Sequence, residues 1–122
     1  MDHSLNLFKE KIMSHTDKYK DCIKACLDCF RECNHCASAC LEEDDVKMMA
    51  KCIALDMDCA DICATTAAAM ARGSEHIGHL CRVCAEICEA CGAECERHDA
   101  DHCQKCAEAC KRCAQECRKM AA

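Results

Sequence analysis

The sequence predicts an all-α fold: an up-down-up-down four-helix bundle with a short N-terminal helix and a core lined by cysteines. Nineteen of the 122 residues are cysteine, whereas proline is absent and there are only three glycines. In three stretches the cysteines recur at alternating steps of three and four. This spacing averages about 3.5 residues and follows one continuous face of a helix. Cysteine therefore occupies the positions at which a helix bundle normally places leucine.

Sixteen of the cysteines form three phased rows. The rows are Cys22, Cys26, Cys29, Cys33, Cys36 and Cys40; Cys81, Cys84, Cys88, Cys91 and Cys95; and Cys103, Cys106, Cys110, Cys113 and Cys117. The other three, Cys52, Cys59 and Cys63, are separated by steps of seven and four. Antiparallel helices that turn these faces toward one another would enclose a core built of sulfur.

The second long helix places other residue types in the cysteine register. Continuing that register puts Met49, Asp56, Thr66 and Met70 toward the same interior. Asp56 is then expected to face the thiols, unless a small rotation of the helix leaves its carboxylate in solvent.

A single domain over residues 1–122 accommodates these helices, and the composition indicates no linker. In a leading segment over 1–14, Leu5, Phe8 and Ile12 have helical spacing and predict a small amphipathic helix. The bundle helices are expected over residues 16–42, 45–72, 74–98 and 101–120.

Capping residues set these boundaries. The expected N-caps are Thr16 or Asp17 for the first helix, Asp44 or Asp45 for the second and Ser74 for the third. Gly73, directly before Ser74, is typical of the residue that ends a helix in a left-handed conformation.

The remaining helix faces are predicted to meet solvent or neighbouring helices. Charged residues form solvated sides on the last two helices: Arg82, Glu86, Glu89 and Glu94, and Lys105, Glu108, Lys111, Arg112, Gln115, Glu116 and Lys119. Beside the cysteine rows lie apolar residues that can pack helices or subunits: Ile23, Leu27, Phe30, Leu55 and Ile62. Gly78 and Gly92 favour a close approach between helices.

A disulfide framework is disfavoured, although the cysteine content would fit one. The cysteine count is odd, and turn residues are scarce. Cysteines three or four apart on a helix have Cβ atoms about 5–6 Å apart, beyond the roughly 3.5–4.5 Å that a disulfide tolerates. The first residues contain no apolar run of signal-peptide length, so we expect reduced thiols and a cytoplasmic location.

Two classes of partner are excluded by composition. A formal net charge of −6, with two Phe, one Tyr and no Trp, offers neither a basic stripe nor a stacking platform for nucleic acid. No stretch is apolar enough to span a membrane.

The thiol rows point to copper(I). By rotamer choice, thiolates three or four residues apart can bring their sulfurs to about 4.5 Å, twice a metal–sulfur bond of about 2.2–2.3 Å. A metal that accepts two sulfurs in near-linear geometry can thus bridge one helical turn. Copper(I) is soft, prefers thiolate and thioether ligands, and fits this geometry.

Three alternatives remain. A zinc or general metallothionein-like buffer would need tetrahedral sites, which usually lie on turns rather than on uninterrupted helices. An iron–sulfur electron-transfer protein would need cysteines that wrap around a cluster. A purely structural bundle would use cysteine as a small apolar filler, but sixteen phased cysteines exceed what packing requires.

Charge neutrality bears on the copper content. If each Cu(I) bound two thiolates that no other ion shared, many uncompensated negative charges would lie inside the bundle, at a high energetic cost. Sharing each thiolate between two ions moves the ratio toward one Cu(I) per sulfur. We therefore expect many ions per chain, on the order of 15–20 Cu(I).

The residues that carry these patterns resemble the cytosolic copper storage protein family, which is often mislabelled ferredoxin-like. The resemblance lies in CIKACLDCFRECNHCASAC (22–40), MDCADIC (57–63) and CRVCAEICEACGAECERHDADHCQKCAEACKRCAQEC (81–117), and covers about residues 16–122. It implies a homotetramer of four-helix bundles whose core cysteines bind many Cu(I) ions. It also implies one bundle end closed by apolar residues and an open end that carries His or Met.

Topology sorts the remaining soft ligands between the two ends of the bundle. One end gathers Met48, Met49, His98 and His102, and we favour it as the metal entrance; the alternative is that these are ordinary turn and helix-end residues. The opposite end gathers Met70, Ile77, Leu80 and Met120, with Phe8 and Ile12 available as a plug. His76 and His79 also lie near that second end.

The expected metal ligands are therefore the nineteen cysteines with His98 and His102. Spacing singles out no nucleophile–base pair, so we expect no enzymatic activity. Copper would be delivered by a copper chaperone or a small thiol.

Overall fold

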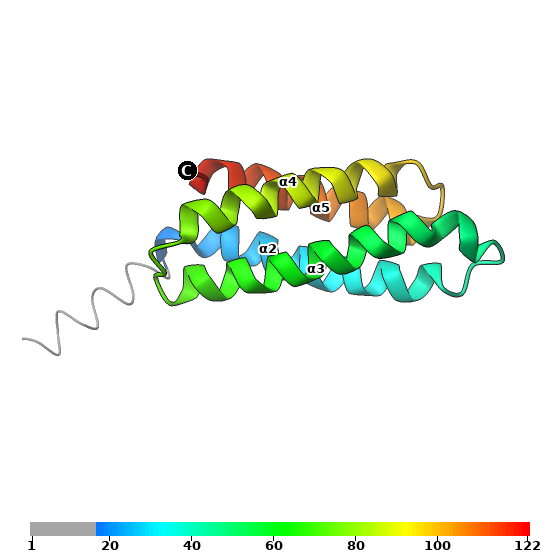
Figure 1. Ribbon diagram of the computed structural model, residues 1–122, viewed down its shortest axis with the longest axis horizontal. Helices are drawn as coiled ribbons and strands as arrows, with labels where there is room; N and C mark the ends of the chain where they lie inside the picture. Colours follow the sequence, from blue (N-terminus) through cyan, green and yellow to red (C-terminus); the bar gives the residue numbers. More distant parts are fainter. Residues whose placement is uncertain (1–16) are drawn as a thin grey trace, which may run out of the picture.

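The computed structural model describes residues 17–122, which form four long helices joined by short connections (Figure 1). The long helices are α2 (Lys20–Cys40), α3 (Ala50–Ala71), α4 (Ile77–Glu96) and α5 (Asp101–Met120), and a short 3₁₀ helix, η1 (Val46–Met49), precedes α3. The predicted four-helix bundle is confirmed. The helix predicted over 1–14, with its plug residues Phe8 and Ile12, lies outside the described residues.

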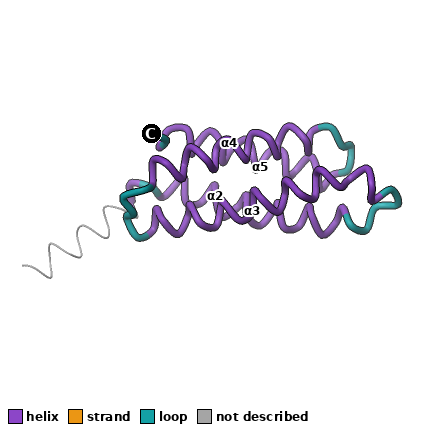
Figure 2. Tube along the Cα trace, viewed as in Figure 1, coloured by secondary structure: helices purple, strands orange, loops and turns teal. Residues whose placement is uncertain are grey.

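The bundle has an up-down-up-down arrangement. Each helix packs against the next one along the chain, and α5 returns to pack against α2. Figure 2 shows the connections at the two ends: the α2–α3 and α4–α5 connections share one end, and the α3–α4 connection lies at the other, near the C-terminus. The topology therefore gathers the residues of each end as the sequence predicts.

The helix boundaries confirm some capping predictions and correct others. Asp45 caps η1, because its side chain accepts a hydrogen bond from the Met48 N–H. Gly73 has a positive φ of 68°, as a left-handed helix end requires. The N-cap prediction for Ser74 is wrong: its hydroxyl accepts from the His76 N–H inside the turn, and α4 begins at Ile77.

The prediction that Thr16 or Asp17 caps the first bundle helix is also wrong. The N-cap of α2 is Tyr19, which makes no side-chain capping hydrogen bond. The helix thus begins at Lys20, directly after Tyr19.

Small residues let the helices approach closely enough for sulfur to fill the core. A Cβ atom added to Gly92 of α4 would lie 3.3 Å from the Cys110 Cβ of α5. One added to Gly78 would lie 2.8 Å from the Ala122 Cβ, and the Ala122 N–H donates to the Gly78 carbonyl at 3.1 Å. The close approach between helices is confirmed for Gly92, whereas Gly78 instead approaches Ala122, which follows the end of α5.

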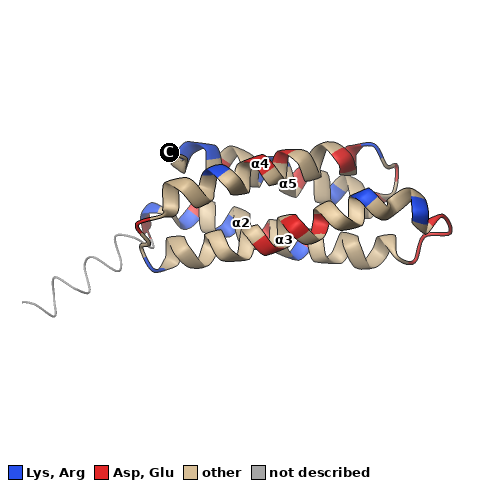
Figure 3. Ribbon diagram, viewed as in Figure 1, with Lys and Arg blue, Asp and Glu red and all other residues tan. Residues whose placement is uncertain are grey.

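Lys, Arg, Asp and Glu residues occur along all four long helices and in their connections (Figure 3). Among the residues predicted on the solvated sides, Glu94 is the exception, and that prediction is wrong for it: only 6% of its side chain is exposed. It is buried because His98, Arg97 and Lys51 surround its carboxylate with positive or donor groups.

The outward surface of α2 and α3 also carries large apolar side chains. Leu27 and Phe30 on α2 and Met57 on α3 are all exposed. None of the helices within residues 17–122 combines the length and apolar character that crossing a membrane requires.

Candidate metal centre

The cysteine rows of the four helices meet in one continuous column of sulfur along the bundle axis. All nineteen cysteines are fully buried, and each is a free thiol. Across helices, the Cys59 Sγ lies 3.4 Å from the Cys88 Sγ and 3.6 Å from the Cys29 Sγ. The core that a bundle normally fills with leucine is therefore filled with thiols.

Within a helix, the sulfurs approach more closely than the sequence predicts. The Cys29 and Cys33 Sγ atoms are 3.8 Å apart, and those of Cys59 and Cys63 are 4.0 Å apart. These distances are close to van der Waals contact and shorter than the separation of about 4.5 Å that near-linear coordination needs. A rotamer change of one thiol per pair would provide the longer separation.

The thiols form overlapping groups of four whose sulfur atoms all lie within 4.8 Å of one another. Three of these groups are Cys29, Cys63, Cys88 and Cys113; Cys29, Cys33, Cys59 and Cys110; and Cys33, Cys91, Cys106 and Cys110. Because neighbouring groups share cysteines, the column offers ligands that can bridge two ions rather than separate sites with no ligand in common. Soft ions that accept shared thiolates fit such an arrangement.

Asp56 lies inside the thiol column, which settles the choice that the sequence left open. Its Oδ1 is 3.2 Å from the Cys91 Sγ and 3.3 Å from the Cys106 Sγ, and the side chain is fully buried. Burial raises the pKa of its carboxyl group to about 8. Asp56 therefore adds a carboxyl group, protonated at neutral pH, to the otherwise sulfur-lined centre.

At the end that holds the α2–α3 and α4–α5 connections, His102 closes the thiol column. Its Nδ1 lies 3.5 Å from the Cys103 Sγ, 3.6 Å from the Cys36 Sγ and 3.8 Å from the Cys40 Sγ. These four residues form a further four-ligand group, and 16% of the imidazole side chain is exposed. The Nε2 atom pairs with the Glu43 carboxylate at 2.8 Å.

His98 lies at the same end but has a different partner. Its Nε2 pairs with the Glu94 carboxylate at 2.8 Å, and 11% of its side chain is exposed. His98 also lines a surface hollow of about 270 Å³, together with Met48 and Met49. Met48 is exposed and Met49 is buried, so only one of the two methionines faces solvent.

The opposite end gathers buried apolar side chains. Met70 and Ile77 are buried there, whereas the side chains of His76 and His79 are exposed. His79 bonds to Arg82 and His76 contacts Glu75, so neither histidine turns toward the thiols. Thr66, one turn before Met70, is fully buried, and its Oγ1 has no hydrogen-bond partner in the described part of the chain.

Burial favours the neutral form of two thiols at the histidine-lined end, Cys103 and Cys40. It raises the pKa of Cys103 to about 11 and also raises the pKa of Cys40 above its ordinary value. A metal that binds here as a thiolate complex must therefore displace protons.

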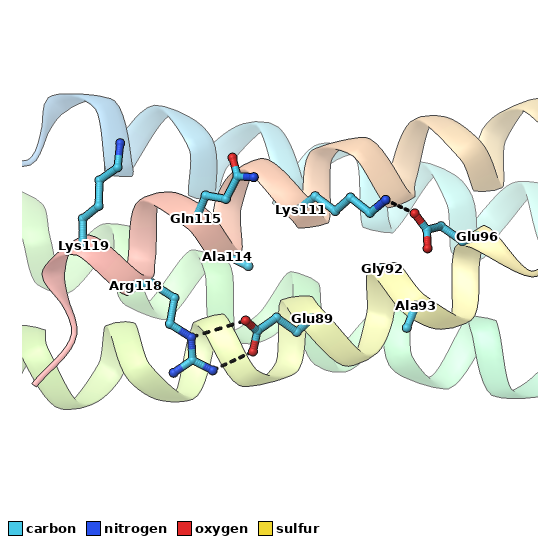
Figure 4. A pocket seen from close by; sticks show the side chains of 9 residues that line it. All are labelled: Glu89, Gly92, Ala93, Glu96, Lys111, Ala114, Gln115, Arg118 and Lys119. Carbon is cyan, nitrogen blue, oxygen red and sulfur yellow. Dashed lines mark hydrogen bonds and ion pairs between the residues drawn. The ribbon is translucent and has the colours of Figure 1, made fainter.

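A surface groove of about 670 Å³ lies elsewhere, between α4 and α5 (Figure 4). Ion pairs between Arg118 and Glu89, at 2.6 Å, and between Lys111 and Glu96 border it. Its lining contains no cysteine or histidine. This groove is separate from the thiol column.

Sequence reasoning missed the two carboxylates that hold the histidines. The Glu94–His98 pair has the i,i+4 spacing of helical neighbours, so periodicity alone could have found it. The Glu43–His102 pair joins residues 59 positions apart in the sequence, one in the α2–α3 connection and the other in the first turn of α5, so no local sequence pattern indicates it.

Comparisons with known proteins agree with this geometry. The family model described as copper storage protein matches residues 15–122. Cu(I)-bound BsCsp3 of Bacillus subtilis is 53% identical, with a TM-score of 0.82 over 85% of this chain and 98% of that chain. A cytosolic copper storage protein from Streptomyces lividans, solved with five coppers, is 42% identical, with a TM-score of 0.83 over 88% of this chain and 94% of that chain.

A curated relative, an uncharacterised cysteine-rich protein of Bacillus subtilis, is 54% identical over 66 residues. That alignment spans 54% of this chain and 61% of the relative's length. With a family match that extends over all four bundle helices, the chain belongs to the copper storage protein family.

Proposed function

We propose that this protein is a cytosolic store and buffer of Cu(I), which it holds as thiolate-bound ions inside the bundle. The observation that carries the proposal is the continuous column of buried, free thiols that belong to overlapping groups. Soft Cu(I) accepts two or three shared thiolates, whereas four-coordinate zinc favours a closed set of four ligands. Loaded relatives support the same assignment.

The proposed ligands are the nineteen cysteines, with His98 and His102 as weaker ligands at the entrance. His102 is suited to bind through Nδ1, which faces three sulfurs. His98 lines the hollow outside the column, where it could hold Cu(I) transiently. The number of thiols increases from this end inward, so the binding of the ion becomes more favourable as it moves into the bundle.

The capacity follows from charge neutrality. Each bound thiolate carries one negative charge, and unpaired charges are costly inside a bundle. One Cu(I) per sulfur makes the interior nearly neutral, which gives on the order of 15–20 ions per chain.

Storage requires no chemical transformation, and we propose that the protein is not an enzyme. Copper would reach the entrance from a copper chaperone or a small thiol, since free Cu(I) is bound tightly by thiols. The whole chain, residues 1–122, would act as one domain.

We also propose that four copies assemble into a homotetramer. The exposed Leu27, Phe30 and Met57 on the outer surface of α2 and α3 offer apolar area that an assembly would bury. Light scattering of wild-type protein and of a Leu27→Glu/Met57→Glu variant tests this: a tetramer should give way to smaller species. A wild-type monomer would contradict it.

A metal-competition experiment tests the choice of copper over zinc. Reduced protein is offered Zn(II), freed of excess metal and then titrated anaerobically with Cu(I). We expect Cu(I) to displace any bound zinc completely. Zinc retained in copper excess would favour a metallothionein-like zinc buffer instead.

A further inference from the structure

We propose that Glu43 is a positioning residue for His102: its carboxylate holds the imidazole so that Nδ1 faces the three outermost thiols. The consequence for copper capture rests on the proposed function, but the positioning itself belongs to the metal-free protein. The His102 Nε2 lies 2.8 Å from the Glu43 Oε1, which is the shortest polar contact of the ring.

Hydrogen-bond chemistry fixes the roles of the two ring nitrogens. An ionised carboxylate can only accept, so Nε2 must carry the proton of this hydrogen bond. In a neutral imidazole the other nitrogen, Nδ1, then has a free lone pair. That lone pair lies 3.5–3.8 Å from the sulfurs of Cys103, Cys36 and Cys40.

The backbone places Glu43 well for this task. Glu43 is the third residue after the end of α2, and its N–H donates to the Cys40 carbonyl at 3.2 Å. Cys40 is itself one of the thiols that face Nδ1. The Glu43 carboxylate is thus anchored close to Cys40, one of the thiols toward which it orients the His102 ring. Its bond to His102 joins the α2–α3 connection to the first turn of α5.

Within the described residues, Glu43 provides the only hydrogen bond to Nε2. Without it, the ring could exchange its two nitrogens by rotation or turn out toward solvent, because it is partly exposed. Outer hydrogen bonds of this kind typically change metal affinity or activity about 10–100-fold when they are removed.

NMR of the reduced, metal-free full chain tests the positioning directly. We expect a hydrogen-bonded Nε2–H signal of His102 that exchanges slowly in the wild type and in Glu42→Ala, a neighbouring exposed control. The signal should be lost in Glu43→Ala and kept in Glu43→Gln, whose amide oxygen can still accept. An unchanged signal in Glu43→Ala would overturn the proposal.

Anaerobic loading kinetics test the consequence. Glu43→Ala should slow uptake of the first Cu(I) equivalents about tenfold, whereas Glu43→Gln should keep most of the wild-type rate. In a His102→Phe background, Glu43→Ala should cause no further slowing. Slowing that persists in that background, or that Gln fails to rescue, would mean that the carboxylate attracts the cation instead. If Glu43→Ala loses the NMR signal but Glu43→Ala and His102→Phe each load at the wild-type rate, the positioning role stands and the entrance role in the proposed function fails.

Discussion

Asp56 Oδ1 lies 3.2 Å from the Cys91 Sγ, so a carboxyl group takes the place of a thiol in the middle of the cysteine column. Two more sulfurs, those of Cys106 and Cys95, lie 3.3 and 3.4 Å from the same oxygen. This dry, sulfur-lined surrounding favours the protonated acid. The metal-free protein therefore carries a buried proton whose loss should be visible in its stability.

The first prediction concerns the pH dependence of the metal-free protein. The pKa of Asp56 is raised to about 8, whereas an unfolded Asp has a pKa of about 3.9. Between these values the folded state binds the extra proton, so the free energy of unfolding should fall as pH rises, by up to about 1.4 kcal/mol per pH unit from this group.

Denaturant unfolding of reduced protein at pH 5, 6 and 7 measures this slope. Asp56→Asn keeps the volume and one acceptor oxygen but cannot titrate, so its slope should be smaller than that of the wild type. Equal slopes would mean that Asp56 does not hold a proton in this range.

The second prediction concerns the buried hydroxyl of Thr66. Because its Oγ1 has no hydrogen-bond partner among residues 17–122, replacing it with the isosteric Val should remove a desolvation cost. Thr66→Val is expected to raise the free energy of unfolding of the metal-free protein by about 1–3 kcal/mol. The exposed neighbour Thr65 supplies the control, and Thr65→Val should change the free energy of unfolding little. Destabilisation by Thr66→Val would show that the hydroxyl is satisfied in solution.

The third prediction is that the bundle folds without metal. Neutral thiols act as small apolar groups, and Ala and other helix-favouring residues are abundant. Far-UV circular dichroism of reduced, metal-free protein should show high helix content that changes little when Cu(I) is added. A random-coil spectrum before loading would place the protein among chains that fold only on metal binding.

The fourth prediction separates the rate of loading from capacity. His98→Phe/His102→Phe should slow loading but leave the final copper content nearly unchanged, because two peripheral imidazoles are few and weaker than thiolates. Cys88→Ala and Cys110→Ala remove thiols deep in the column and should each lower capacity by about one Cu(I).

Stopped-flow absorbance and metal analysis of the loaded variants measure the two effects. A histidine double variant that loads at the wild-type rate would make these residues ordinary turn residues. The entrance would then have to be sought at His76 and His79, although both side chains are exposed and turned to other partners.

The bundle and its thiol core were predictable because both depend on periodicity. A cysteine every three or four residues defines one face per helix, and four such faces can only be buried together. The same register placed Asp56 and Thr66 inside. Burial of Asp56 was left open because a lone carboxylate in an apolar core is costly, and the raised pKa is how the fold accommodates it.

The errors arose where tertiary contacts override local preference. Glu94 belongs to a charged run, yet it is buried because His98 and Arg97 enclose it. Ser74 is a strong N-cap type, but its hydroxyl is used inside the turn. The role of Glu43 was not predictable because His102 is distant in the sequence, and the two meet only when the α2–α3 connection and the first turn of α5 lie at the same bundle end.

Anaerobic titration of reduced protein with Cu(I), read against a competing chelator of known affinity, tests the central claim most directly. If the shared thiols act as one store, each chain should withhold well over ten Cu(I) from the chelator, on the order of 15–20, with release of protons from the neutral thiols. Saturation at about one to four equivalents, as a closed four-ligand zinc-type site would give, would contradict copper storage by the thiol column.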